Sequence, residues 1–195
     1  MVKQNTFSVN NLVTGAIMTA MVVVFQLLGT FTAFFGPFST AVGLIPISIG
    51  AMLCGPYIGA WLGLVFAIVI FASGGANLFF AFDVFGTIVT VTIKGMACGF
   101  ASGWVYRKLQ GFNQTIAAIT ASFTCPLVNT GLFLGGCALF FLDDVTGIAA
   151  EIASPETGMA LFLALAMANF IFELGMSAVV SPITVRLLKL RKKQK

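Results

Sequence analysis

The stretch FDVFGTIVTVTIKGMACGF, residues 82–100, decides the fold, because it is apolar enough to cross a bilayer yet carries Lys94 near its middle. A lysine at that depth costs about 2.5–3.5 kcal/mol on insertion scales and needs a partner or a cavity. The whole chain is similarly apolar: of its 195 residues, 59% are hydrophobic and 8% are charged, and its mean hydropathy is +1.05. A soluble domain carries about 25% charged residues. The sequence therefore predicts an integral membrane protein.

The apolar runs predict an all-α fold, a compact bundle of six transmembrane helices in one domain over residues 1–195. A helical span needs about 20 residues, and short breaks rich in Gly, Pro and polar residues separate the runs. The first run has no small-residue cleavage site in a plausible place, so we interpret it as a retained helix and not as a signal peptide. The spans are predicted at residues 11–33, 40–54, 57–73, 84–105, 114–142 and 158–186.

The distribution of Lys and Arg predicts the orientation. With both termini in the cytoplasm, Lys3, Arg107, Lys108 and the basic cluster after residue 185 all lie on that side, as the positive-inside rule requires. A multi-pass protein of a cell membrane is expected. The aromatic residues Tyr57, Trp61, Trp104 and Tyr106 then fall at the cytoplasmic interface, and the acidic residues Asp83, Asp143, Asp144, Glu151 and Glu156 fall outside.

The residue types present give little support to catalysis or metal binding. Histidine is absent, which removes the commonest general base and metal ligand. No catalytic constellation can be assembled for a membrane enzyme, and no cofactor or metal site is predicted. We expect the four cysteines to be small buried hydrophobic residues, since all fall in apolar runs without a C-x-x-C pair: Cys54, Cys98, Cys125 and Cys137.

Polar residues lie within four predicted spans, and in two of these they recur at helical spacing. Asp83, Thr87, Thr90 and Lys94 share one face of the fourth span, and Asn169, Glu173 and Ser177 share one face of the sixth. The fifth span carries Asn129 and Thr130, and the first carries Gln26.

These residues leave three interpretations open. Lys94 and Glu173 form a structural ion pair, or both line a polar cavity with Asn129 and Asn169 that opens to the outside, or Glu173 relays protons.

Small residues mark two further spans. Gly15, Ala16 and Ala20 are predicted on one face of the first span, and Gly55, Gly59 and Gly63 recur every four residues at the start of the third. Such spacing lets helices approach closely, which is a common packing device in membranes.

Taken together, these residues resemble the substrate-binding S components of energy-coupling factor (ECF) vitamin transporters. The resemblance covers nearly the whole chain and includes the six spans, the basic C-terminus, the A-x-x-x-A pair Ala16 and Ala20, and the stretch CGPYIGAWLG. Within that group, FDVFGTIVTVTIKG and PLVNTGLF are most similar to the pantothenate-type S components.

The resemblance implies a function and partners. S components capture a vitamin from outside and dock through small residues of the first helix on a transmembrane coupling subunit carried by two cytoplasmic ATPases. The chain has no Walker A motif, so ATP hydrolysis would fall to those partners. A stand-alone proton-coupled carrier or channel is the alternative function. On this resemblance Gly15, Ala16 and Ala20 would dock on the coupling subunit, and the substrate-binding candidates are Lys94, Thr90, Thr87, Asn129, Asn169, Glu173 and Asn77.

Lys94 is expected to pair with a ligand carboxylate, while Asn129 and Asn169 serve hydroxyl or amide groups. Glu173 either accepts hydrogen bonds from ligand hydroxyls or is protonated at that depth.

Overall fold

The computed structural model describes residues 9–31, 42–141 and 155–193. Every regular element in these ranges is a helix, as predicted, and the ranges contain no strand. The helices are α1 (Val9–Phe31), α2 (Leu44–Cys54), α3 (Pro56–Ala72), α4 (Asn77–Phe80), α5 (Val84–Leu109), α6 (Gln114–Phe140) and α8 (Pro155–Lys193).

The six predicted spans each overlap a helix, but the helices differ in reach. Four stretches, in α1, α5, α6 and α8, are long and apolar enough to cross a membrane. The other two, α2 and α3, are apolar but have only 11 and 17 residues. At 1.5 Å per residue, α2 is about half as long as the roughly 30 Å hydrocarbon core is thick. The short helix α4, which lies in a predicted break, was not foreseen.

Side-chain caps and glycine set the ends of the central helices. Asp83 caps α5, since its carboxylate accepts hydrogen bonds from the backbone N–H groups of Phe85 and Gly86 at 3.0 and 2.8 Å. Asn113 caps α6 in the same way. Gly55 has φ of 106°, a left-handed conformation that favours glycine, and it allows α2 to turn directly into α3. Asp83 therefore begins the helix that carries Lys94.

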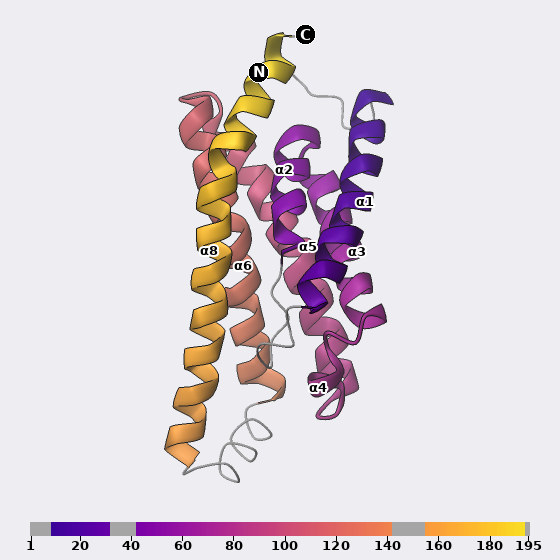
Figure 1. The fold of residues 1–195 in the computed structure, drawn as a ribbon, viewed down its shortest axis with the longest axis vertical. Coiled ribbons are helices and arrows are strands. Elements are labelled where there is room, and N and C mark those ends of the chain that lie inside the picture. The colour runs from indigo at the N-terminus through magenta and orange to yellow at the C-terminus, as the bar shows by residue number, and fades with distance from the viewer. Residues whose placement is uncertain (1–8, 32–41, 142–154, 194–195) are drawn as a thin grey trace.

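The helices form a bundle with α5 at its centre (Figure 1). One side of α5 packs on α3 and the other on α6; α8 covers α6, and α1 covers α2 and α3. The start of α1, the α5–α6 turn and the end of α8 lie at one end of the bundle, and α4 lies at the other (Figure 1). We call these the basic end and the α4 end.

Four glycines bring α3 and α5 into backbone contact. A Cβ atom on Gly59 or Gly63 of α3 would collide with the carbonyl of Gly99 or Gly95 of α5, and the reverse also holds. We call these four residues the glycine seam. The tight packing that the glycine spacing predicted for the third span is thus made with α5. Because Lys94 immediately precedes Gly95, the seam also fixes the rotation of α5 that places Lys94.

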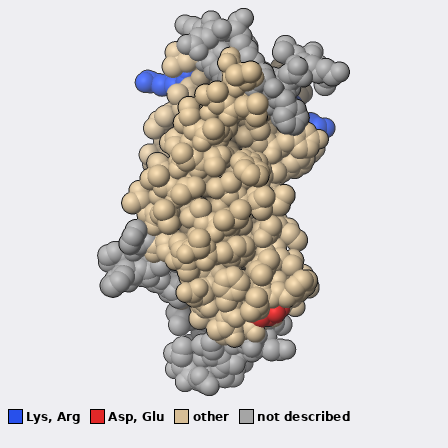
Figure 2. Space-filling view, turned by 90° about the vertical axis from the view of Figure 1, so that its right-hand side faces the viewer, with Lys and Arg blue, Asp and Glu red and all other residues tan. Residues whose placement is uncertain are grey.

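Charged side chains separate along the bundle. Among the described residues on the visible face, Figure 2 shows Lys and Arg near one end and an acidic side chain near the other, with uncharged side chains between them. Tyr57, Trp61 and Trp104 are 67%, 54% and 50% exposed, whereas Tyr106 is buried in the core at 4%. Tyr106 therefore packs within the bundle and does not belong to an exposed aromatic belt. The four cysteines are all buried, as predicted.

Candidate functional site

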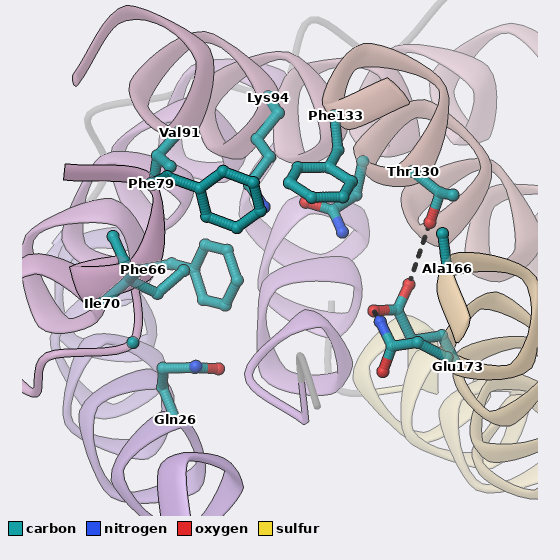
Figure 3. A pocket seen from close by; sticks show the side chains of 14 residues that line it. Gln26, Phe66, Ile70, Phe79, Val91, Lys94, Thr130, Phe133, Ala166 and Glu173 are labelled. Carbon is teal, nitrogen blue, oxygen red and sulfur yellow. Dashed lines mark hydrogen bonds between the residues drawn. The ribbon is translucent and has the colours of Figure 1, made fainter. Parts of the chain in front are cut away.

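A central cavity lies within the bundle, between α1, α3, α5, α6 and α8, with part of its wall from the segment leading into α4 (Figure 3). Its volume is about 60 Å³, enough for several water molecules. Aromatic rings line one part of it: Phe66, Phe79 and Phe133. Its polar lining comes from four helices and consists of Gln26, Lys94, Asn129, Thr130, Asn169 and Glu173.

Lys94 extends from α5 toward this cavity (Figure 3). Its ammonium group lies over the Phe133 ring, 4.6 Å from the ring centroid. A cation over an aromatic face is stabilised by the ring quadrupole, and more strongly where water is excluded. Phe133 therefore holds the ammonium group at the cavity wall without neutralising it, so its positive charge stays available to an anion.

Glu173 is buried on α8, with 5% of its surface exposed. One carboxylate oxygen accepts a hydrogen bond from Asn169 Nδ2 at 2.9 Å, and the other accepts one from Thr130 Oγ1 at 3.4 Å. Asn169 lies one helical turn before Glu173, and Thr130 lies on α6. Uncharged donors thus orient Glu173. Within the described residues Lys94 and Glu173 form no direct ion pair, so the contact that the first of the three interpretations expects is not seen.

Several buried polar atoms at the cavity lack partners among the described residues. They are both amide atoms of Gln26 and the Oδ1 atoms of Asn129 and Asn169. Gln26 is fully buried, and Asn129 is 4% exposed. A buried polar group without a partner costs about 1–3 kcal/mol, so such groups normally meet water or a ligand. The arrangement suits a small molecule that carries both hydrogen-bond donors and acceptors.

Of the seven predicted substrate-binding residues, four line the cavity: Lys94, Asn129, Asn169 and Glu173. The other three lie elsewhere. Thr87 donates a hydrogen bond to the Asp83 carbonyl at 2.6 Å, and Thr90 packs against Gly136 of α6. Both threonines are buried. Asn77 is exposed at the start of α4.

The structure adds residues that were not among the site predictions. Gln26 is an amide within an apolar span, and that is the signal in the sequence that could place it in the site. Thr130 follows Asn129 directly in the same span. The rings of Phe66, Phe79 and Phe133 carried no such signal, because the chain has 21 phenylalanines and apolar spans use them throughout.

The predicted docking residues of α1 divide between two faces. Ala16 and Ala20 are exposed, among the exposed side chains of Leu12, Val13 and Ile17. Gly15 is buried, and a Cβ there would lie 3.3 Å from Ile58 of α3. Ala16 and Ala20 therefore share an exposed face, as predicted, but Gly15 does not lie on it. Successive residues of a helix point about 100° apart around its axis, so Gly15 and Ala16 face different directions.

Comparison with known proteins gives one match. A family model described as "ECF transporter, substrate-specific component" matches residues 10–185. A search of curated proteins and a search of solved structures found no match.

Proposed function

The chain belongs to the family of ECF transporter substrate-specific components, and from this membership we propose that it captures a vitamin, with pantothenate as the specific candidate, in the central cavity. The family is one of membrane-embedded substrate-binding subunits of transporters and not of enzymes. Beyond the family, the vitamin, the site residues, the topology and the partner subunits are our proposals.

The observation that carries the proposal is the set of groups that face one cavity. An ammonium group, a carboxylate and four unpartnered amide atoms converge there from α1, α5, α6 and α8. Helix packing alone does not require so many buried polar groups in an apolar bundle, since each unpartnered atom opposes folding. A bound ligand would supply the missing partners.

Pantothenate has a carboxylate, two hydroxyls and an amide, and these groups match the lining. Lys94 would bind the carboxylate through a charge-assisted hydrogen bond. The amides of Gln26, Asn129 and Asn169 offer donors and acceptors to the ligand amide and hydroxyls. Glu173 would accept from a hydroxyl, and Asn169 and Thr130 already hold it in place.

Binding of a vitamin also requires the cavity to widen. Its volume of about 60 Å³ is far below the roughly 300–1,000 Å³ of pockets that hold small organic ligands. We therefore infer that the structure represents a closed state, and that ligand entry accompanies a separation of helices around the cavity.

The remaining proposals concern delivery. With the basic end in the cytoplasm, the chain is a multi-pass protein of a bacterial plasma membrane with six membrane-inserted helices and both termini inside. Ala16 and Ala20 would dock on the transmembrane coupling subunit of the ECF module, whose two ATPases supply the energy. Small exposed residues suit such docking because they let a partner helix approach closely.

A stand-alone proton-coupled carrier is the second candidate, because Glu173 is a buried acid that contacts only neutral donors in the described part of the chain. Proteoliposomes that contain this chain alone separate the two functions. Uptake driven by a pH gradient without ATPase partners would favour the carrier, and ATP-dependent uptake only in the presence of the ECF module would favour our proposal.

The ligand can be identified directly. The full chain is purified in mild detergent without added vitamin, and the retained small molecules are identified by mass spectrometry, with Lys94→Met purified in parallel. We expect pantothenate, or another vitamin with an anionic group, from the parent and much less from Lys94→Met. A neutral ligand, or equal retention by both proteins, would contradict the proposed role of Lys94.

A further inference from the structure

A second hollow in the structure lies outside the central cavity, between the first turns of α6 and the last turns of α8. Its volume is about 410 Å³, and its lining includes Thr115, Ile119 and Phe123 of α6 and Ala178, Ser181 and Arg186 of α8. We call it the α6–α8 groove. It shares no lining residue with the central cavity and has no role in the proposed transport function.

Polar side chains line the outer part of the groove, beside the apolar Ile119, Pro182 and Val185, and its deepest part is wholly apolar. Thr115 and Arg186 lie nearest the basic end of the bundle, because α6 begins there and α8 ends there (Figure 1). Ser181 lies five residues before Arg186, which is about 7.5 Å deeper along the helix. Ala178 and Phe123 lie about 12 Å below the mouth and present only hydrocarbon. A phospholipid has this order of groups, with a phosphate, then ester carbonyls, then acyl chains.

Ser181 supplies the second observation. The residue is 3% exposed, it lines the groove, and its Oγ atom has no hydrogen-bond partner in the described part of the chain. One turn away, the Thr184 hydroxyl donates to the Val180 carbonyl at 3.1 Å, which is the usual arrangement for a hydroxyl in an apolar helix. Ser181 thus holds an unused donor at the depth where a lipid ester carbonyl would lie.

The charge at the mouth selects the headgroup. Arg186 is exposed at the edge of the groove and is the basic residue among those that line it. A guanidinium group binds phosphate oxygens in a two-pronged geometry, and basic pockets between membrane helices attract anionic headgroups. We propose that the α6–α8 groove binds one anionic phospholipid, with its phosphate at Arg186, an ester carbonyl at Ser181 and an acyl chain along Phe123 and Ala178.

Native mass spectrometry of the purified full chain tests the proposal. Phosphatidylglycerol and phosphatidylcholine with the same acyl chains are titrated separately, and the apparent Kd of the first bound lipid is measured. We expect phosphatidylglycerol to bind more tightly, and Arg186→Gln to weaken its binding about fivefold or more while leaving phosphatidylcholine unchanged. Ser181→Ala is too small a change to disturb folding, and it should weaken the binding of both lipids.

Lys108→Gln is the matched control, because Lys108 is a basic residue at the same end of the bundle but outside the groove. It should leave both affinities unchanged. A phosphatidylglycerol with a photoreactive acyl chain should label peptides that contain residues 115–123 or 178–186. Equal affinity for the two lipids, equal effects of Arg186→Gln and Lys108→Gln, or labelling confined to other helices would overturn the proposal.

Discussion

In the described part of the chain, Lys94 and Glu173 face the same central cavity without forming an ion pair. The Lys94 ammonium group lies over the Phe133 ring, and the Glu173 carboxylate accepts hydrogen bonds from Asn169 and Thr130. Both ionisable groups are therefore positioned by neutral neighbours. An anion that enters the cavity does not have to break an existing ion pair in order to reach Lys94.

Replacement of Lys94 tests whether its ammonium group binds an anionic ligand. Lys94→Met should weaken binding of the anionic ligand by about 1.5–3 kcal/mol, the usual value of a hydrogen bond to a charged group. Lys94→Arg should also bind poorly, because a planar guanidinium group does not fit the place of a compact ammonium group. Isothermal titration with pantothenate gives the affinities, and thermal unfolding gives Tm for each variant.

The double variant Lys94→Met with Glu173→Gln provides the control. If the two residues stabilised the fold as a pair, the double variant would recover both stability and binding. We expect the double variant to be stable but not to bind pantothenate. Parental affinity in the double variant would refute a Lys94 contact with the ligand.

Replacement of Gln26 should stabilise the ligand-free fold and weaken ligand binding. Gln26→Leu removes an amide that is buried without a partner, so Tm of the ligand-free protein should rise. The same change should weaken ligand binding at least tenfold if the amide contacts the ligand. Thr30→Val, one turn along α1, is the matched control, because the Thr30 hydroxyl already bonds the Gln26 carbonyl at 3.0 Å. It should leave affinity unchanged, and equal losses from both variants would count against a direct contact.

The glycine seam should tolerate no side chain. In Gly95→Ala the added methyl group would meet the Gly63 backbone, which cannot move aside as a flexible side chain can. We expect a loss of stability of about 1–3 kcal/mol, together with weaker ligand binding, because Lys94 would shift. Gly131→Ala is the control, since nothing lies within 4 Å of a Cβ there. The stability of the Gly131→Ala variant should stay the same or increase, because alanine favours a helix more than glycine does.

Substitutions on the exposed face of α1 should impair docking on the coupling subunit without impairing ligand binding. Ala16→Trp or Ala20→Trp should abolish ATP-dependent uptake in proteoliposomes that contain the ECF module, while ligand affinity of the isolated chain stays unchanged. The control is Ala138→Trp, at an exposed position on α6. If the two α1 variants lost binding in the isolated protein as well, α1 would not serve as a separate docking surface.

Orientation in the membrane can be measured by cysteine labelling in a background without the native cysteines. Leu78, on α4, and Lys108, at the end of α5, lie at opposite ends of the bundle and are both exposed. A membrane-impermeant maleimide added to intact cells should modify Leu78→Cys and spare Lys108→Cys. The reverse result would place the basic end outside and overturn the predicted topology.

The sequence was sufficient to predict elements whose cause is local. Continuous apolar runs specify helices, and Gly55 and Pro56 specify the turn between α2 and α3. Four of the cavity residues were identifiable because Lys94, Asn129, Asn169 and Glu173 are too polar for a lipid-facing surface.

The remaining features depend on how the helices pack. Thr87 and Thr90 share a broad face with Lys94, but both threonines are buried, Thr90 against Gly136 of α6, and of the three only the lysine lines the cavity. Gln26 reaches the cavity because α1 is rotated to bury Gly15 against Ile58. No periodicity within one helix specifies such rotations, because they are set by the shapes of the neighbouring helices.

The glycine seam also determines which helices are able to open the cavity. Because the backbones of α3 and α5 are in contact at the seam, we expect these two helices, which carry Phe66 and Lys94, to move together. The helix α8, by contrast, leaves most of its large apolar side chains exposed and packs chiefly against α6. Admission of a ligand should therefore move α8 away from a fixed half of the molecule. Such a motion would carry Asn169 and Glu173 outward and return them to the ligand on closing.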